Sequence, residues 1–177
     1  THTCRQSVGV TSGTYTLSVY AKQGGYNNLL VSFDSHSGGV GVNLDDLSVF
    51  RDENNDGYTI EDFGNGWVRI AVTITASSTA SPNFYVYSNA ATPAITHAGD
   101  GTSGIYIYGA QVEAGSYATS YIPTYGTSVT RNQDNSIIAD PGDIIADAKG
   151  SFFIDINVDF LDTNGLIPIT AGSGTAA

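Results

Sequence analysis

The stretch GIYIYGAQVEAGSYATSYIPTYGTSVTR, residues 104–131, is the one from which the fold is best read. Its first part, Ile105 to Tyr108, alternates β-branched and aromatic residues, which predicts a β-strand. We expect Gly109 to end that strand, and residues 113–116 to form a turn. An extended run follows at residues 117–121. The stretch contains no nucleophile, acid/base pair or metal-ligand cluster, and we expect it to close a β-domain.

Strand-like stretches with alternating apolar and polar residues recur along the chain, with turn residues between them. No stretch has a convincing helical period. The clearest strands are predicted at residues 14–22, 29–34, 67–75 and 84–88, with a first strand at 3–10. This pattern is typical of a two-layered antiparallel fold, and we predict an all-β antiparallel β-sandwich of jelly-roll type.

The quoted stretch closely resembles a signature of bacteriophage tail fibre, tail spike and related virion proteins. In those proteins it ends a β-sandwich similar to the family 4/9 carbohydrate-binding modules. The resemblance extends upstream to SGTYTLSVYAK (12–22), IEDFGNGWVRIAVT (60–73) and GDGTSGIYIYG (99–109). It implies a protein of the virion, on the particle surface or tail, with other virion proteins as partners. It also implies a homo-oligomer, commonly a trimer.

The composition changes after Arg131, and we predict three parts. Residues 1–131 form the carbohydrate-binding-module-like sandwich, residues 132–150 a polar linker, and residues 151–177 an incomplete second β-domain or an arm that pairs with another subunit. The run SFFIDINVDFLD (151–162) predicts a strand, and two strands cannot bury a face alone. The chain has no Met and begins at Thr1, so we expect it to be a piece of a longer protein.

Charge and composition exclude several classes of function. The 177 residues carry a formal net charge of −11, and such a surface repels nucleic-acid phosphates and anionic membranes. No apolar run reaches membrane-spanning length. Cys4 is the only cysteine, so there is no internal disulfide. We expect its thiol to be buried, with an interchain link as the alternative.

The residue types of common catalytic and metal sites do not cluster. His2, His36 and His97 are far apart in the sequence, in predicted loops and without metal-ligand spacing. No carboxylate pair or Gly-x-Ser-x-Gly elbow stands out. Residues 51–57, RDENNDG, begin like a calcium loop, but Phe63 stands where an EF-hand requires Glu, which favours a plain hairpin turn. We predict a non-enzymatic chain without a cofactor; a structural calcium ion stays open.

The candidate binding surface is an aromatic and polar face. Flat aromatic rings stack on the apolar faces of sugars, and nearby Lys and Arg side chains bond the hydroxyl groups. Alternation places six candidate residues opposite the apolar core: Tyr20, Lys22, Trp67, Arg69, Tyr85 and Tyr87. Tyr106 and Tyr108 fall on the same side, but the isoleucines beside them favour a strand buried on both faces. Packing or subunit contact is the rival explanation for all these aromatic residues.

We therefore expect a non-enzymatic structural or attachment module of a phage tail fibre, spike or particle-surface protein, with host-surface glycans as its candidate ligands. Two alternatives stay open. One is the carbohydrate-binding module of a larger polysaccharide-degrading enzyme, and the other is a structural spacer without a ligand. The fold does not separate the three, because function is grafted onto such sandwiches.

Overall fold

The computed structural model describes residues 2–6, 8, 10–33, 38–76, 82–87, 89 and 92–131. The chain divides into two units, Thr1–Thr130 and Arg131–Ala177. Apart from Arg131, the second unit lies outside the described residues. The linker and the second β-domain or arm therefore stay predictions, as does the loop position of His36.

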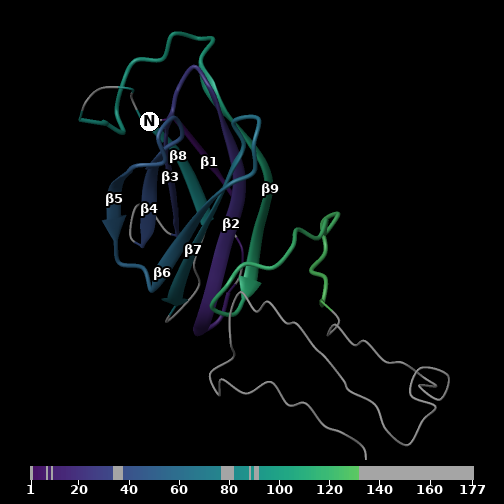
Figure 1. Ribbon diagram of the computed structural model, residues 1–177. Helices are drawn as coiled ribbons and strands as arrows, with labels where there is room; N and C mark the ends of the chain where they lie inside the picture. Colours follow the sequence, from purple (N-terminus) through teal and green to yellow (C-terminus); the bar gives the residue numbers. More distant parts are fainter. Residues whose placement is uncertain are drawn as a thin grey trace, which may run out of the picture. The chain divides into compact units, whose positions relative to one another are not determined.

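The described residues form nine β-strands and no helix, in two antiparallel sheets (Figure 1). The first sheet has the order β1-β8-β3-β4-β5 and the second β6-β7-β2-β9. The prediction of an all-β sandwich is confirmed. The strands are β1 (His2–Arg5), β2 (Gly13–Gly24), β3 (Asn28–Phe33), β4 (Gly39–Asn43), β5 (Val49–Glu53), β6 (Gly57–Asp62), β7 (Val68–Ala76), β8 (Pro82–Tyr87) and β9 (Gly104–Ala114).

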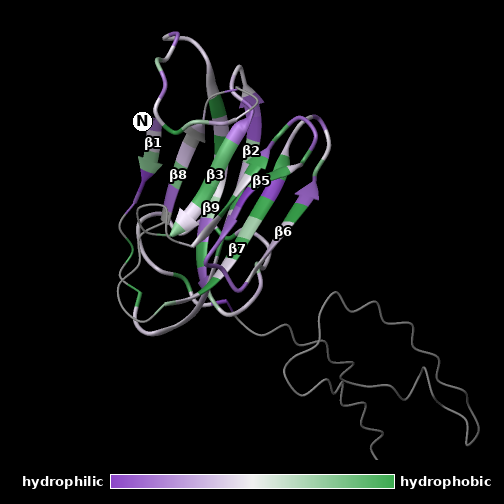
Figure 2. Cartoon of the chain, turned by 90° about the vertical axis from the view of Figure 1, so that its left-hand side faces the viewer, coloured by the Kyte–Doolittle hydropathy of each residue, from purple (hydrophilic) through white to green (hydrophobic). Residues whose placement is uncertain are grey.

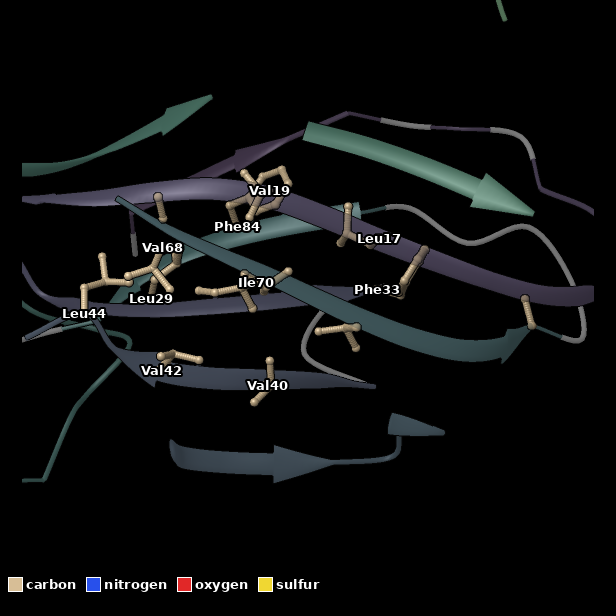
Figure 3. Packing of buried hydrophobic residues seen from close by; sticks show 14 of the residues in the cluster. Leu17, Val19, Leu29, Phe33, Val40, Val42, Leu44, Val68, Ile70 and Phe84 are labelled. Carbon is tan, nitrogen blue, oxygen red and sulfur yellow. The ribbon is translucent and has the colours of Figure 1, made fainter. Parts of the chain in front are cut away.

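Alternation along the central strands builds the core between the two sheets (Figure 2). Every second residue of β2 points inward, and Leu17 and Val19 pair with Val72 and Ile70 of β7. The facing layer comes mainly from β3, β4 and β8 (Figure 3). Each fully buried aliphatic side chain of this kind contributes roughly 1.5–3 kcal/mol. The main buried apolar residues are Leu17, Val19, Ala21, Leu29, Val31, Phe33, Val40, Val42, Val68, Ile70, Val72 and Phe84.

The boundaries of two predicted strands are wrong. β1 covers His2–Arg5 instead of residues 3–10. β9 does not end at Gly109 but continues to Ala114. Gly109 has a φ of 60°, and the register between β2 and β9 shifts between Ser18 and Tyr20. The glycine therefore allows a bulge within one long strand, which sequence alone reads as a strand end.

The polar turn after β5 is not a hairpin, so that prediction is wrong as well. β5 belongs to one sheet and β6 to the other, and the turn between them carries the chain across the sandwich. Asn54 adopts a left-handed φ of 48° there, and the Asn55 side chain accepts a hydrogen bond from the Gly57 backbone N–H at 3.1 Å. Turn residues serve a sheet crossing as well as a hairpin.

The chain beyond β9 turns back over the outward side of β2, β7 and β9. We call residues 116–122 the return segment. It forms no strand and is held by side chains: Thr73 Oγ1 donates to the carbonyl of Ser116 at 3.2 Å, and the backbone N–H of Ile122 donates to Gln111 Oε1 at 2.8 Å. Glu113 accepts from the backbone N–H of Thr119 at 3.0 Å. In the part of the chain that the structure describes, no helix is long and apolar enough to cross a membrane.

Candidate functional site

The six predicted site residues do not share one face. Tyr20 and Lys22 lie on β2 and Arg69 on β7, all on the outward side of the β6-β7-β2-β9 sheet, opposite the core positions. Trp67 directly precedes β7 and is half-buried. Tyr85 and Tyr87 lie on β8, in the other sheet. Alternation shows which side of a strand a residue takes, but not to which sheet the strand belongs.

Tyr85 and Tyr87 are packed. They are only 6% and 5% exposed and form a small second cluster with Leu30, against which Phe50 and Ile95 pack. The Tyr87 hydroxyl accepts a hydrogen bond from Arg51 Nη1 at 3.1 Å. These two rings offer no free face to a ligand.

Tyr106 and Tyr108 are exposed, so the expectation that they are packed is wrong. Their exposed fractions are 63% and 59%. β9 is an edge strand that pairs only with β2 among the described strands. The outward side of its first half is largely open to solvent, which a pattern of alternating Tyr and Ile does not reveal.

Four rings on the outward side of this sheet contact one another in succession, and we call Phe63, Tyr20, Tyr108 and Tyr121 the aromatic row. The ring centres of Phe63 and Tyr20 are 5.1 Å apart, edge to face. Those of Tyr20 and Tyr108 are 6.2 Å apart, and those of Tyr108 and Tyr121 5.4 Å. The four residues of the row come from the β6–β7 turn, β2, β9 and the return segment, in that order. Phe63 and Tyr121 were missed because strand alternation carries no signal in loops.

Arg69 lies next to the row and is buried. Its Nη2 donates to Ser18 Oγ at 3.2 Å and also to the carbonyl of Thr119. The centre of its guanidinium is 5.3 Å from the centre of the Tyr20 ring, within cation–π range. Arg69 thereby fixes both a ring of the row and the return segment that supplies Tyr121.

Lys22 fixes the other end of the row. Its Nζ donates to the carbonyl of Asn65 at 2.6 Å, in the turn between β6 and β7. That turn is closed by a hydrogen bond from the backbone N–H of Phe63 to the carbonyl of Trp67 at 2.8 Å. The lysine therefore helps to hold Phe63 beside Tyr20.

The two described histidines lie together, contrary to the expectation of isolated loop residues. His2 belongs to β1, and its ring centre is 4.8 Å from that of His97, which is 5.0 Å from that of Tyr26. A cavity of about 280 Å³ opens beside His2 and Cys4. The Cys4 thiol is exposed, so the expectation of a buried thiol is wrong. Within the described ranges, no group of three or more His, Cys, Asp or Glu residues could hold a metal ion.

The carboxyl group of Asp100, near the start of β9, has a lowered pKa. Asp100 accepts hydrogen bonds from Ser103 Oγ at 2.5 Å and from the backbone N–H groups of Ser103 and Thr102 at 2.7 and 2.9 Å. These bonds, led by that of the Ser103 side chain, hold the pKa of Asp100 well below its ordinary value. The group stabilises the loop that leads into β9 and has no contact with the row.

Comparison with known protein families gives no match, and no significant relative is found among curated proteins.

Proposed function

We propose that this chain is a non-enzymatic attachment module that binds glycans through the aromatic row, as a part of a phage tail fibre, spike or particle-surface protein. The observation that carries the binding proposal is the row itself, with Tyr108 and Phe63 largely exposed in it. The virion setting is supported by the resemblance of residues 104–131 and the three upstream pieces.

The row suits a sugar chain better than it suits a core. Soluble domains seldom leave several aromatic rings exposed side by side without a role for them. Sugar rings have an apolar face that stacks on an aromatic ring, while their hydroxyl groups need donors and acceptors nearby. The hydroxyl groups of Tyr20 and Tyr108 and the ammonium group of Lys22, all on the outward side of this sheet, can supply such groups.

The expected contribution of one ring can be estimated. Stacking a sugar on Tyr108 removes about 60 Å² of apolar surface from water, which at about 25 cal/mol per Å² gives about 1.5 kcal/mol. This corresponds to roughly a tenfold change in the dissociation constant. The loss of one ring is therefore measurable even for a weak ligand.

A glycan array with the full chain tests the proposal, with host-surface polysaccharides among the probes. Tyr108→Ala should weaken every glycan signal about tenfold. Tyr125→Ala is the matched control, because Tyr125 is 93% exposed and lies outside the row. Absence of binding to any glycan, or equal loss in both variants, would contradict the proposal.

A subunit contact is the second candidate role for this surface. One edge of β9 has no partner among the described strands, and Tyr106, Ile107 and Tyr108 on this strand are exposed. Light scattering distinguishes the two. If Tyr108→Ala lowers the oligomeric state while the glycan array stays blank, the row is a packing surface.

A further inference from the structure

We propose that a cavity beside Tyr121 is a second binding position for the glycan on the aromatic row, and that it takes one uncharged sugar unit. The inference rests on the glycan-binding function proposed above and adds a site and the charge class of the sugar in it. The cavity lies between residues 110–112 of β9, Phe84 and the chain at residues 124–128. We call it the edge cavity, because β9 is the edge strand of its sheet.

The edge cavity adjoins the aromatic row and has room for a sugar unit. Its volume is about 440 Å³, within the usual range for ligand cavities. Tyr121 lines it, and the ring centre of Tyr121 is 5.4 Å from that of Tyr108 in the row. The next residue, Ile122, also lines the cavity and is fixed to Gln111 of β9 by its backbone N–H. A glycan that stacks on the row therefore has the edge cavity directly beyond the last ring.

The floor of the edge cavity is apolar and consists of core side chains. Leu17 and Phe84 line it and belong to the hydrophobic core, with exposed fractions of 0% and 7%. Val112 also lines it and pairs with Leu17 in the register of β2 and β9. Ligand cavities combine such an apolar lining with a few polar groups that orient the ligand. The apolar face of a sugar ring fits against these three side chains.

The rim of the edge cavity carries polar side chains that the described part of the chain leaves unused. The backbone N–H of Thr127 donates to the carbonyl of Thr124 at 3.1 Å and closes a turn at the rim. Within the described ranges, the side-chain groups of Gln6, Thr124 and Ser128 make no hydrogen bond, and all three residues line the cavity. A hydroxyl group donates one hydrogen bond and accepts two, and an amide group also does both. These are the partners that sugar hydroxyl groups need.

No charged side chain is found among the described residues that line the edge cavity. A carboxylated sugar would lose water there without meeting a counter-ion, which costs free energy. The formal net charge of −11 adds repulsion of anionic ligands. An uncharged sugar meets neither cost, and its hydroxyl groups pair with the rim. The edge cavity therefore selects for neutral hexose or N-acetylhexosamine units.

The test measures the affinity of the full chain for ladders of neutral hexose and N-acetylhexosamine oligosaccharides of increasing length, by isothermal titration calorimetry. In the wild type, the longer oligosaccharides should bind at least about tenfold more tightly than the shortest, because they reach the edge cavity. Ala110→Phe places a ring in the cavity from an exposed position on β9, and should abolish this gain while the shortest oligosaccharides bind as before. Ala114→Phe is the matched control, because Ala114 is exposed on the same strand but does not line the cavity.

Thr124→Val removes one hydroxyl group from the rim at nearly constant shape and should reduce the gain severalfold, whereas Thr130→Val, at an exposed position outside the cavity, should not. The Thr124→Val variant keeps the test decisive if circular dichroism shows that Ala110→Phe is unfolded. Hexuronate oligosaccharides of the same lengths should gain less with length than neutral ones. No gain with length in the wild type, an equal gain for hexuronates, or a gain that Ala110→Phe and Thr124→Val leave unchanged would overturn this inference and leave the proposed function intact. Binding to no glycan would overturn both.

Discussion

Replacing Gly109 by alanine is expected to destabilise the sandwich by about 2–3 kcal/mol and to disturb the aromatic row. Gly109 lies within β9 at a φ of 60°, in the left-handed region. A Cβ at this position would lie 3.2 Å from Cδ2 of Tyr20 and 3.3 Å from Cδ2 of Tyr121. Both rings would have to move by a few tenths of an ångström.

The magnitude has two parts. A non-glycine residue in the left-handed region costs roughly 1–2 kcal/mol. Overpacking against rings that other contacts hold in place adds about 1 kcal/mol, at the low end of the range for such changes. Tyr20 contacts Phe63 and Tyr108, and Tyr121 contacts Tyr108, so the displacement of either ring reaches the rest of the row.

Urea unfolding of three variants separates the two parts. At Gly104 an added Cβ would meet no other atom and φ is not positive, so Gly104→Ala should change stability by less than about 0.5 kcal/mol. At Gly64 an added Cβ would also meet no other atom, but φ is 77°. The loss of stability in Gly64→Ala should therefore measure the cost of the left-handed backbone conformation alone. Gly109→Ala should shift the urea midpoint by about 1 M and exceed Gly64→Ala. A Gly109→Ala effect equal to that of Gly104→Ala would refute the reasoning.

Three further outcomes are expected. Tyr85→Ala should destabilise the chain by about 3–5 kcal/mol because its ring is buried, whereas Tyr108→Ala should cost less than about 1 kcal/mol; urea unfolding checks both. Asp100→Asn should lower stability at pH 6, because a lowered carboxyl pKa stabilises the fold above the unfolded value of about 4. That difference from the wild type should shrink steadily as the pH falls below about 4, and a constant difference in urea midpoints would contradict it. Cys4 should react with a thiol reagent at the rate of a free cysteine in the native chain, and protection until urea is added would contradict its exposure.

The sequence predicted best where a strand lies in the middle of its sheet. In β2 and β7 every second residue enters the core, so alternation is sufficient to assign Leu17, Val19, Ile70 and Val72. It is also sufficient to place Tyr20, Lys22 and Arg69 on the opposite side. The local pattern is reliable in these two strands because each is paired on both edges, so that the same side of the strand faces the core throughout.

The prediction failed where the answer depends on partners distant in sequence. Tyr85 has the same alternation as Tyr20, but β8 pairs with β1 and β3, and this ring packs into a second cluster. Tyr106 and Tyr108 looked packed because no local signal marks β9 as an edge strand. Phe63 and Tyr121 complete the row from loops whose positions depend on Lys22, Asn65 and the side chains of β9.

The strand order also bears on how the chain acquires its structure. β2 pairs with β9 and β1 pairs with β8, so each sheet joins an early strand to one that follows it by about eighty residues or more. Domains dominated by such long-range pairings have high contact order and fold slowly, within milliseconds to seconds. During synthesis the second sheet cannot be completed until residues 104–114 have left the ribosome. Until then the edge of β2 that pairs with β9 has no partner strand. A nascent chain in this state depends on its acidic charge to resist aggregation.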